Sequence, residues 1–224
     1  STSDLNTYVP MDYKEDLEIK EIEGEVLYKV NLESEKSYEI RNIGENKISI
    51  SNNYARRDEV TYDKNGNIVG YARNRDYSSI ALGEGEKIKI KVSTSDLNTY
   101  VPMDYKEDLE IKEIEGEVLY KVNLESEKSY EIRNKGTNKI SINQNYVKRD
   151  YVKYDKNGNI INYETDTAHT SIALGEGEKI KIKVSTSDLN TYVPIDYKKD
   201  LEIKEIEGEV LYKVNLESEK SYEI

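Results

Sequence analysis

Apolar and polar residues alternate with a period of two along much of the chain. In residues 87–92, which read KIKIKV, Ile88, Ile90 and Val92 fall on one side of an extended backbone and the lysines fall on the other. Because successive side chains of a β-strand point to opposite faces, this pattern predicts a strand with one buried face. Shorter runs of the same kind occur in residues 17–19, 26–32, 38–40, 48–50 and 60–62.

Turn-forming residues separate the predicted strands, for example in residues 23–25, 42–46 and 83–86. Residues 63–67 read DKNGN and lie between two apolar runs, where Asn-Gly is a strong signal for a β-hairpin. Residues 10–24 carry charges suited to a helix, with Pro10 near the start and Gly24 at the end. We predict one helical turn there, followed by a strand from about Leu17.

Long stretches of the chain are repeated. Residues 1–40 recur unchanged as residues 93–132, and again as residues 185–224 with Ile195 and Lys199 in place of Met and Glu. The offset is 92 residues, which is the size of a domain and exceeds that of a solenoid repeat.

Seven or eight short strands per period predict an all-β fold of tandem antiparallel β-sandwich (Ig-like) domains. The preferred frame places units at residues 1–92 and 93–184, with a partial unit at 185–224. An alternative frame, with a partial unit at 1–40 and full units at 41–132 and 133–224, stays open.

Two segments vary between the repeats, at residues 51–79 and 143–171. Their longest run of differences reads ARNRDYS in one repeat and ETDTAHT in the next. These segments are either solvent loops, which tolerate change, or contact surfaces. The candidate partner-binding residues are Tyr54, Arg56, Arg57, Tyr71, Arg73, Arg75 and Tyr77. Tyrosines 28, 38 and 62 are expected in the core instead, because the chain has no Phe or Trp to fill it.

Composition excludes several functions. The chain has 45 acidic and 33 basic residues, for a net charge of −12, which argues against a nucleic-acid partner. Mean hydropathy is −0.84 and no apolar run is long enough for membrane insertion. Without cysteine, and with His169 as the single histidine, neither thiolate chemistry nor a multi-histidine metal site is available. With no recognisable catalytic motif either, we expect no enzyme and no cofactor.

Asp63, Asn65, Asp155 and Asn157 are weak candidates for a metal site. The two loops that contain them place oxygen ligands at alternate positions, as a calcium loop does. They lack the further carboxylates and the distal glutamate that such a loop requires, so a plain hairpin turn is the favoured interpretation.

Residues 37–50 (SYEIRNIGENKISI) and 78–92 (SSIALGEGEKIKIKV) resemble the strand-turn-strand and closing strands of stalk repeats in cell-surface adhesins of Gram-positive bacteria. The resemblance implies an extracellular, cell-surface location and neighbouring identical repeats as partners. Such families often contain a Lys–Asn isopeptide crosslink, but the sequence singles out no residues for one here.

Three functional hypotheses follow. The leading one is a structural stalk or fibre segment, in which rigid domains placed end to end project a functional tip. The alternative is an adhesive module whose variable segments bind a host glycan or host protein. In the third, the chain is the subunit of a self-assembling filament and is completed by strand exchange.

Overall fold

The computed structural model describes residues 3–50, 54–76, 78–142, 146–168 and 171–224. Within these ranges the chain is all-β, and every strand pairing is antiparallel. No helix in the described part is long and apolar enough to cross a membrane.

The strands form two groups. The first group, termed the first unit, spans residues 27–114 and comprises β1 (Leu27–Leu32), β2 (Ser37–Asn42), β3 (Ile48–Ile50), β4 (Arg57–Tyr62), β5 (Ile68–Arg75), β6 (Ile80–Leu82), β7 (Lys87–Val92), β8 (Leu97–Pro102) and β9 (Leu109–Ile114). The second unit spans residues 119–206 and comprises β10 (Leu119–Leu124), β11 (Ser129–Asn134), β12 (Ile140–Ile142), β13 (Arg149–Tyr154), β14 (Ile160–Thr167), β15 (Ile172–Leu174), β16 (Lys179–Val184), β17 (Leu189–Pro194) and β18 (Leu201–Ile206). A short 3-10 helix, η2 (Met103–Asp108), precedes β9, and another, η3 (Ile195–Asp200), precedes β18. A third, η1 (Met11–Asp16), stands at the corresponding place in the first sequence copy.

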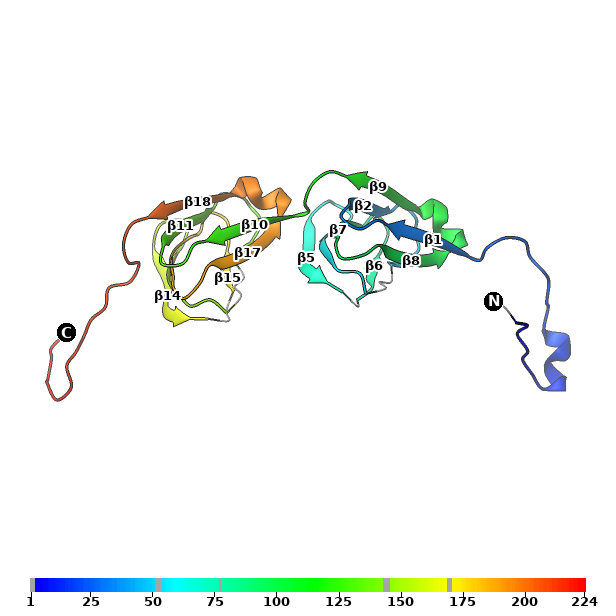
Figure 1. Cartoon of the computed structure of the whole chain (residues 1–224), viewed down its shortest axis with the longest axis horizontal. Helices are drawn as coiled ribbons and strands as arrows, with labels where there is room; N and C mark the ends of the chain where they lie inside the picture. The colour runs from blue at the N-terminus through cyan, green and yellow to red at the C-terminus, as the bar shows by residue number, and fades with distance from the viewer. Residues whose placement is uncertain (1–2, 51–53, 77, 143–145, 169–170) are drawn as a thin grey trace.

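Each unit contains one large and two small sheets. In the first unit the five-stranded sheet has the order β5-β4-β7-β2-β9, and the pairs β1-β8 and β3-β6 form the small sheets. The second unit has the corresponding sheets β14-β13-β16-β11-β18, β10-β17 and β12-β15. Figure 1 shows the two units end to end along the long axis of the molecule.

Small and large sheets share one apolar core. In the first unit Leu32 of β1 and Leu82 of β6 pack with Ile40, Ile88 and Ile90 of the large sheet. All of these side chains are almost completely buried. The alternating KIKIKV segment therefore forms the predicted strand, with its isoleucines in the core and its lysines on the other face.

The predicted hairpin is confirmed. β4 and β5 pair on either side of residues 63–67, and the amide of Gly66 donates to the carbonyl of Asp63 across the turn. Tyr38 is buried in the core of the first unit, as expected, and Tyr28 is half-buried against it. Tyr62 is also buried, but in a separate apolar cluster with Val60, Val118 and Leu119.

The predicted helical turn and following strand form in two of the three sequence copies. η2 leads into β9, and η3 leads into β18. In the first copy η1 forms, but residues 17–22 are extended without a partner. β9 is a strand because it pairs with β2, and β18 because it pairs with β11.

Strand pairing follows neither expected domain frame. β8 and β9 come after residue 92, yet they pair with β1 and β2 over six residues each. A boundary at residue 92 separates these partners, and a boundary at residue 41 cuts through β2.

Chain length explains this arrangement. Residues 1–26 have the same sequence as residues 93–118, which contain β8 and β9. If they took the places of these strands, residue 22 would lie beside Ser37, where Ile114 lies. Residues 23–26 would then have to lead from there back to Leu27, at the other end of β1, where Pro102 pairs. That path covers a six-residue strand, about 17 Å, and the spacing of about 10 Å between packed sheets. The five steps from residue 22 to residue 27 reach at most about 18 Å, so they are too short to cover both.

Candidate functional site: the junction between the two units

The short connection between the units is buried. Val118 and Leu119 pack with Val60 and Tyr62 of β4. Val118 is 1% exposed, whereas Val26, which has the same neighbours in sequence but packs against no other unit among the described residues, is 64% exposed. The connection is therefore part of an apolar interface.

Two surfaces meet at this interface. The tail face of the first unit comes from β4 and β5 and consists of Val60, Tyr62, Ile68, Tyr71 and Arg73. The head face of the second unit comes from β17 and η3 and consists of Tyr192, Val193, Asp196 and Tyr197. The period of two along β4 places Val60 and Tyr62 on the same side.

The hairpin of the first unit also contacts the second unit. Ile68, the first residue of β5, packs against Val193, Tyr197 and Ile140. Burial raises the pKa of Tyr71, and a backbone hydrogen bond with Ser141 opposes this shift. These contacts join β5 to β12, β17 and η3.

A polar contact fixes the orientation of the two faces. The hydroxyl of Tyr62 donates to Oδ2 of Asp196 over 3.1 Å, and Nζ of Lys89 lies 4.0 Å from Oδ1 of the same carboxylate. Burial, and then the charge of Asp196, raise the pKa of the Tyr62 hydroxyl well above its usual range. The hydroxyl therefore stays protonated at neutral pH and acts as a hydrogen-bond donor.

A cation–π contact closes one side of the junction. The guanidinium carbon of Arg73 lies 3.9 Å from the ring centroid of Tyr192. Tyr192 also packs, like Tyr71, against the apolar cluster that contains Val118 and Leu119. Two of the sequence-predicted partner residues, Tyr71 and Arg73, thus contact the neighbouring unit.

The remaining candidates lie elsewhere. Tyr54 is exposed, Arg56 is exposed and lies 3.7 Å from the carboxylate of Asp76, and Tyr77 lies outside the described residues. Arg57 is completely buried inside the first unit. A partner cannot reach its guanidinium on the native surface.

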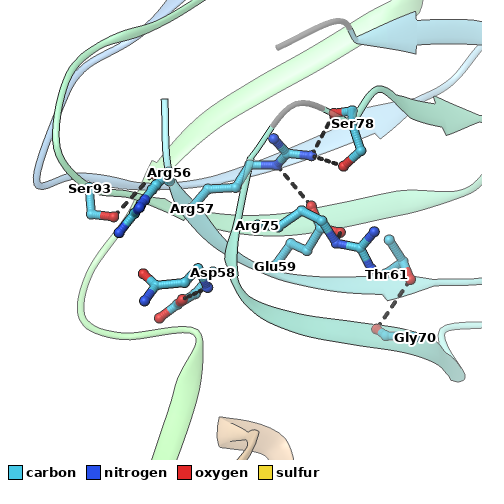
Figure 2. A network of polar contacts seen from close by, with 10 residues as sticks. Arg56, Arg57, Asp58, Glu59, Thr61, Gly70, Arg75, Ser78 and Ser93 are labelled. Carbon is cyan, nitrogen blue, oxygen red and sulfur yellow. Dashed lines mark hydrogen bonds and ion pairs between the residues drawn. The ribbon is translucent and has the colours of Figure 1, made fainter. Parts of the chain in front are cut away.

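Arg57 belongs to a buried polar network (Figure 2). Its Nε donates to Oε2 of Glu59 over 2.8 Å, and its Nη2 donates to the carbonyl oxygen of Ser78 over 2.9 Å. Arg75 lies 3.6 Å from the other oxygen of Glu59. Because both Arg57 and Glu59 are largely removed from water, removing either charge would leave the other poorly compensated.

In the second unit this network is rearranged across the strand pair. Glu59 faces Ala72 in the register of β4 and β5, whereas Tyr151 faces Glu164 in the register of β13 and β14. The carboxylate has thus moved from one strand to the next, and both arrangements contain a buried arginine, Arg57 in the first unit and Arg149 in the second. Burial lowers the pKa of Arg149, while Tyr151 and Glu164 oppose this shift.

The two candidate metal loops satisfy their own oxygens. Oδ1 of Asp63 accepts the backbone amides of Asn65 and Asn67, and Asp155 accepts those of residues 157 and 159 in the same way. These hydrogen bonds lower the pKa of both carboxyl groups. Among the residues that the structure describes, no three His, Asp or Glu side chains gather in a group that could hold a metal ion.

Sequence reasoning missed most of the head face. The candidates did not include Tyr192 or Asp196, because residues 185–196 are rich in Ser, Thr and Asn and stand where the preferred frame begins a new unit. Val118, in the connection, was missed because its copy Val26 belongs to a run predicted as a strand with one buried face. A tyrosine and an acid inside a linker-like segment were the available signal. Comparison with known proteins adds no relative, since no protein-family model matches the chain and no curated protein matches it.

Proposed function

We propose that the chain is a stalk segment of an extracellular surface protein, built from β-sandwich units of a 92-residue repeat. The units are held end to end and project a functional tip away from the surface. The observation that supports this most directly is the packed junction, in which Tyr62 of one unit hydrogen-bonds to Asp196 of the next.

Burial at the junction supports a stiff connection. A flexible tether would leave Val118, Tyr62 and Tyr197 in water, but all three are buried. Hydrophobic burial provides the attraction, and the directional Tyr62–Asp196 contact selects one orientation. With strands of six to eight residues, each unit adds on the order of 20 to 27 Å of length.

An adhesive role for the variable segment has less support. Tyr71 and Arg73 are engaged with the second unit, and Arg57 is buried in the first. The candidate surface is thereby reduced to scattered residues. We therefore place the stalk first among the proposed functions.

Small-angle X-ray scattering with light scattering on the full chain tests the proposal. We expect a monomeric mass at all concentrations and a maximum dimension that matches two units held in line. Val118→Asp should bury a charge in the junction and broaden the distribution of dimensions. Val26→Asp places the same change in the same local sequence at an exposed site, and should leave the scattering unchanged.

Two results would overturn the proposal. One is a wild-type chain whose scattering already fits freely jointed units, because that chain would not transmit stiffness. The other is a mass that rises with concentration, which would favour the self-assembling filament.

A further inference from the structure

The units share one part of the junction and differ in another. The apolar residues of the tail face are the same in both units, since Val152, Tyr154, Ile160 and Tyr163 stand 92 residues after Val60, Tyr62, Ile68 and Tyr71. The head face also recurs, since Tyr100, Val101, Asp104 and Tyr105 stand 92 residues before Tyr192, Val193, Asp196 and Tyr197. Arg73 is the exception, because Thr165 occupies its position in the second unit.

The second tail face shows the junction without a following unit. Ile160 and Tyr163 are 60% and 66% exposed, whereas Ile68 and Tyr71 are half-buried. Tyr100, on the uncovered head face of the first unit, is likewise 55% exposed. The isoleucine and the tyrosines of the two faces are thus more exposed where no partner face covers them, whereas Val152 and Val101 are buried within their own units.

A hollow lies beside Tyr163 and Thr165 of the second tail face. It has a volume of about 1380 Å³, and its lining includes Tyr163, Thr165, Leu211 and Tyr212. At the corresponding place in the first junction, Arg73 lies over the ring of Tyr192, and Tyr71 and Tyr192 pack against the cluster that contains Leu119.

We propose that the residue at the position of Arg73 sets how firmly each unit is held by the unit that follows it. This inference rests on the proposed stalk function and adds that the variable segment encodes the stiffness of individual junctions. The partner of each tail face is the head face of another repeat, with its Tyr-Val-Pro strand. An arginine at this position clamps the partner tyrosine, and a threonine provides no cation to do so.

The size of the effect follows from the type of contact. A cation–π contact at an exposed site shifts an equilibrium about two- to fivefold. The apolar contacts common to both units then keep every junction associated, while the variable position adjusts how often it opens.

Single-molecule energy transfer on the full chain tests the inference. The chain has no cysteine, so cysteines introduced at Glu45 and Lys156 are unique attachment sites for two dyes. Both positions are exposed, and they lie in loops at the ends of the units that face away from the junction. The distance between the dyes reports bending at the junction.

Three variants separate the contributions. Arg73→Thr should raise the bent population about two- to fivefold, and Arg73→Met should do the same, because it keeps most of the apolar stem but not the charge. Thr165→Arg is the matched control, since it makes the reverse exchange on the tail face that is not part of this junction. We expect it to leave the distribution at the wild-type value.

The outcomes distinguish this inference from the proposed function. If wild-type chains show a single narrow distance and Arg73→Thr leaves it unchanged, the stalk stands and the role of position 73 is wrong. If Arg73→Thr bends the chain and Arg73→Met does not, packing and not charge is responsible, and the clamp as described is also wrong. A broad distribution in the wild type refutes the rigid stalk itself.

Discussion

Tyr62 on β4 donates its hydroxyl hydrogen to Asp196 on η3 over 3.1 Å, although the two residues are 134 positions apart. The donor lies at the end of one unit and the acceptor at the start of the next. Neither residue serves the core of its own unit through this bond. The contact therefore couples two parts of the chain that have separate cores.

Tyr62→Phe should loosen the junction and leave the first unit folded. The ring still packs on Val118 and Leu119, but the hydrogen bond to Asp196 is lost, at a cost of about 1 kcal/mol. In urea, the two units of the variant should unfold in more widely separated transitions than the two units of the wild type. Tyr154→Phe is the control, because that tyrosine occupies the same position in the second unit, outside this junction. Equal effects of the two substitutions would contradict a role in coupling.

Stability should decline at alkaline pH. Burial raises the pKa of Tyr62, Tyr71 and Tyr197, which all lie at the junction. Below about pH 10 these hydroxyls are protonated in both the folded and the unfolded chain, so their contribution to the stability of the fold is fully present. Above pH 10 the unfolded chain loses protons that the folded chain retains, and the free energy of unfolding falls as pH rises.

Chemical denaturation at a series of alkaline pH values measures this slope. Tyr62→Phe should make the slope shallower, because one group with a raised folded-state pKa is removed. Tyr54→Phe, at an exposed tyrosine, should not change it. A wild-type free energy of unfolding that stays constant above pH 10 would falsify the raised pKa of these tyrosines in the folded chain.

The two forms of the buried arginine network should be interchangeable. Glu59→Tyr removes the carboxylate beside Arg57 and should destabilise the first unit by about 3 kcal/mol. Adding Ala72→Glu reproduces the arrangement of Tyr151 and Glu164 and should restore most of that loss. A double-mutant cycle measures the coupling, which we expect at about 1 to 3 kcal/mol. Strictly additive effects would show that the paired change between the units is coincidental.

Leu97→Ala and Leu5→Ala test the strand pairing. Both leucines stand in the sequence SDLNTYVP, but Leu97 is completely buried in the first unit and Leu5 is 94% exposed. Leu97→Ala should cost about 2 to 5 kcal/mol, and Leu5→Ala should have almost no effect on the denaturant midpoint. If residues 1–92 instead formed a unit, Leu5→Ala would be the damaging change.

Local sequence was sufficient to predict the β-hairpin and the strands with one buried face. Asn65-Gly66 turns the chain between β4 and β5, and Ile88, Ile90 and Val92 enter the core as their alternation predicts. These features depend on neighbouring residues, because turn geometry and the strand period are properties of a few consecutive positions. The repeat offset was also readable directly, and the strands of the second unit follow those of the first by the same number of residues.

Long-range pairing decided the rest. The segment LEIKEI is an unpaired extended chain at residues 17–22, and it is a strand at Leu109–Ile114. The letters are identical, and only the second copy has β2 beside it. Likewise, Val26 and Val118 differ in burial because a tail face covers only the second. A strand needs a hydrogen-bonding partner and an apolar face needs a cover, and both come from residues distant in sequence.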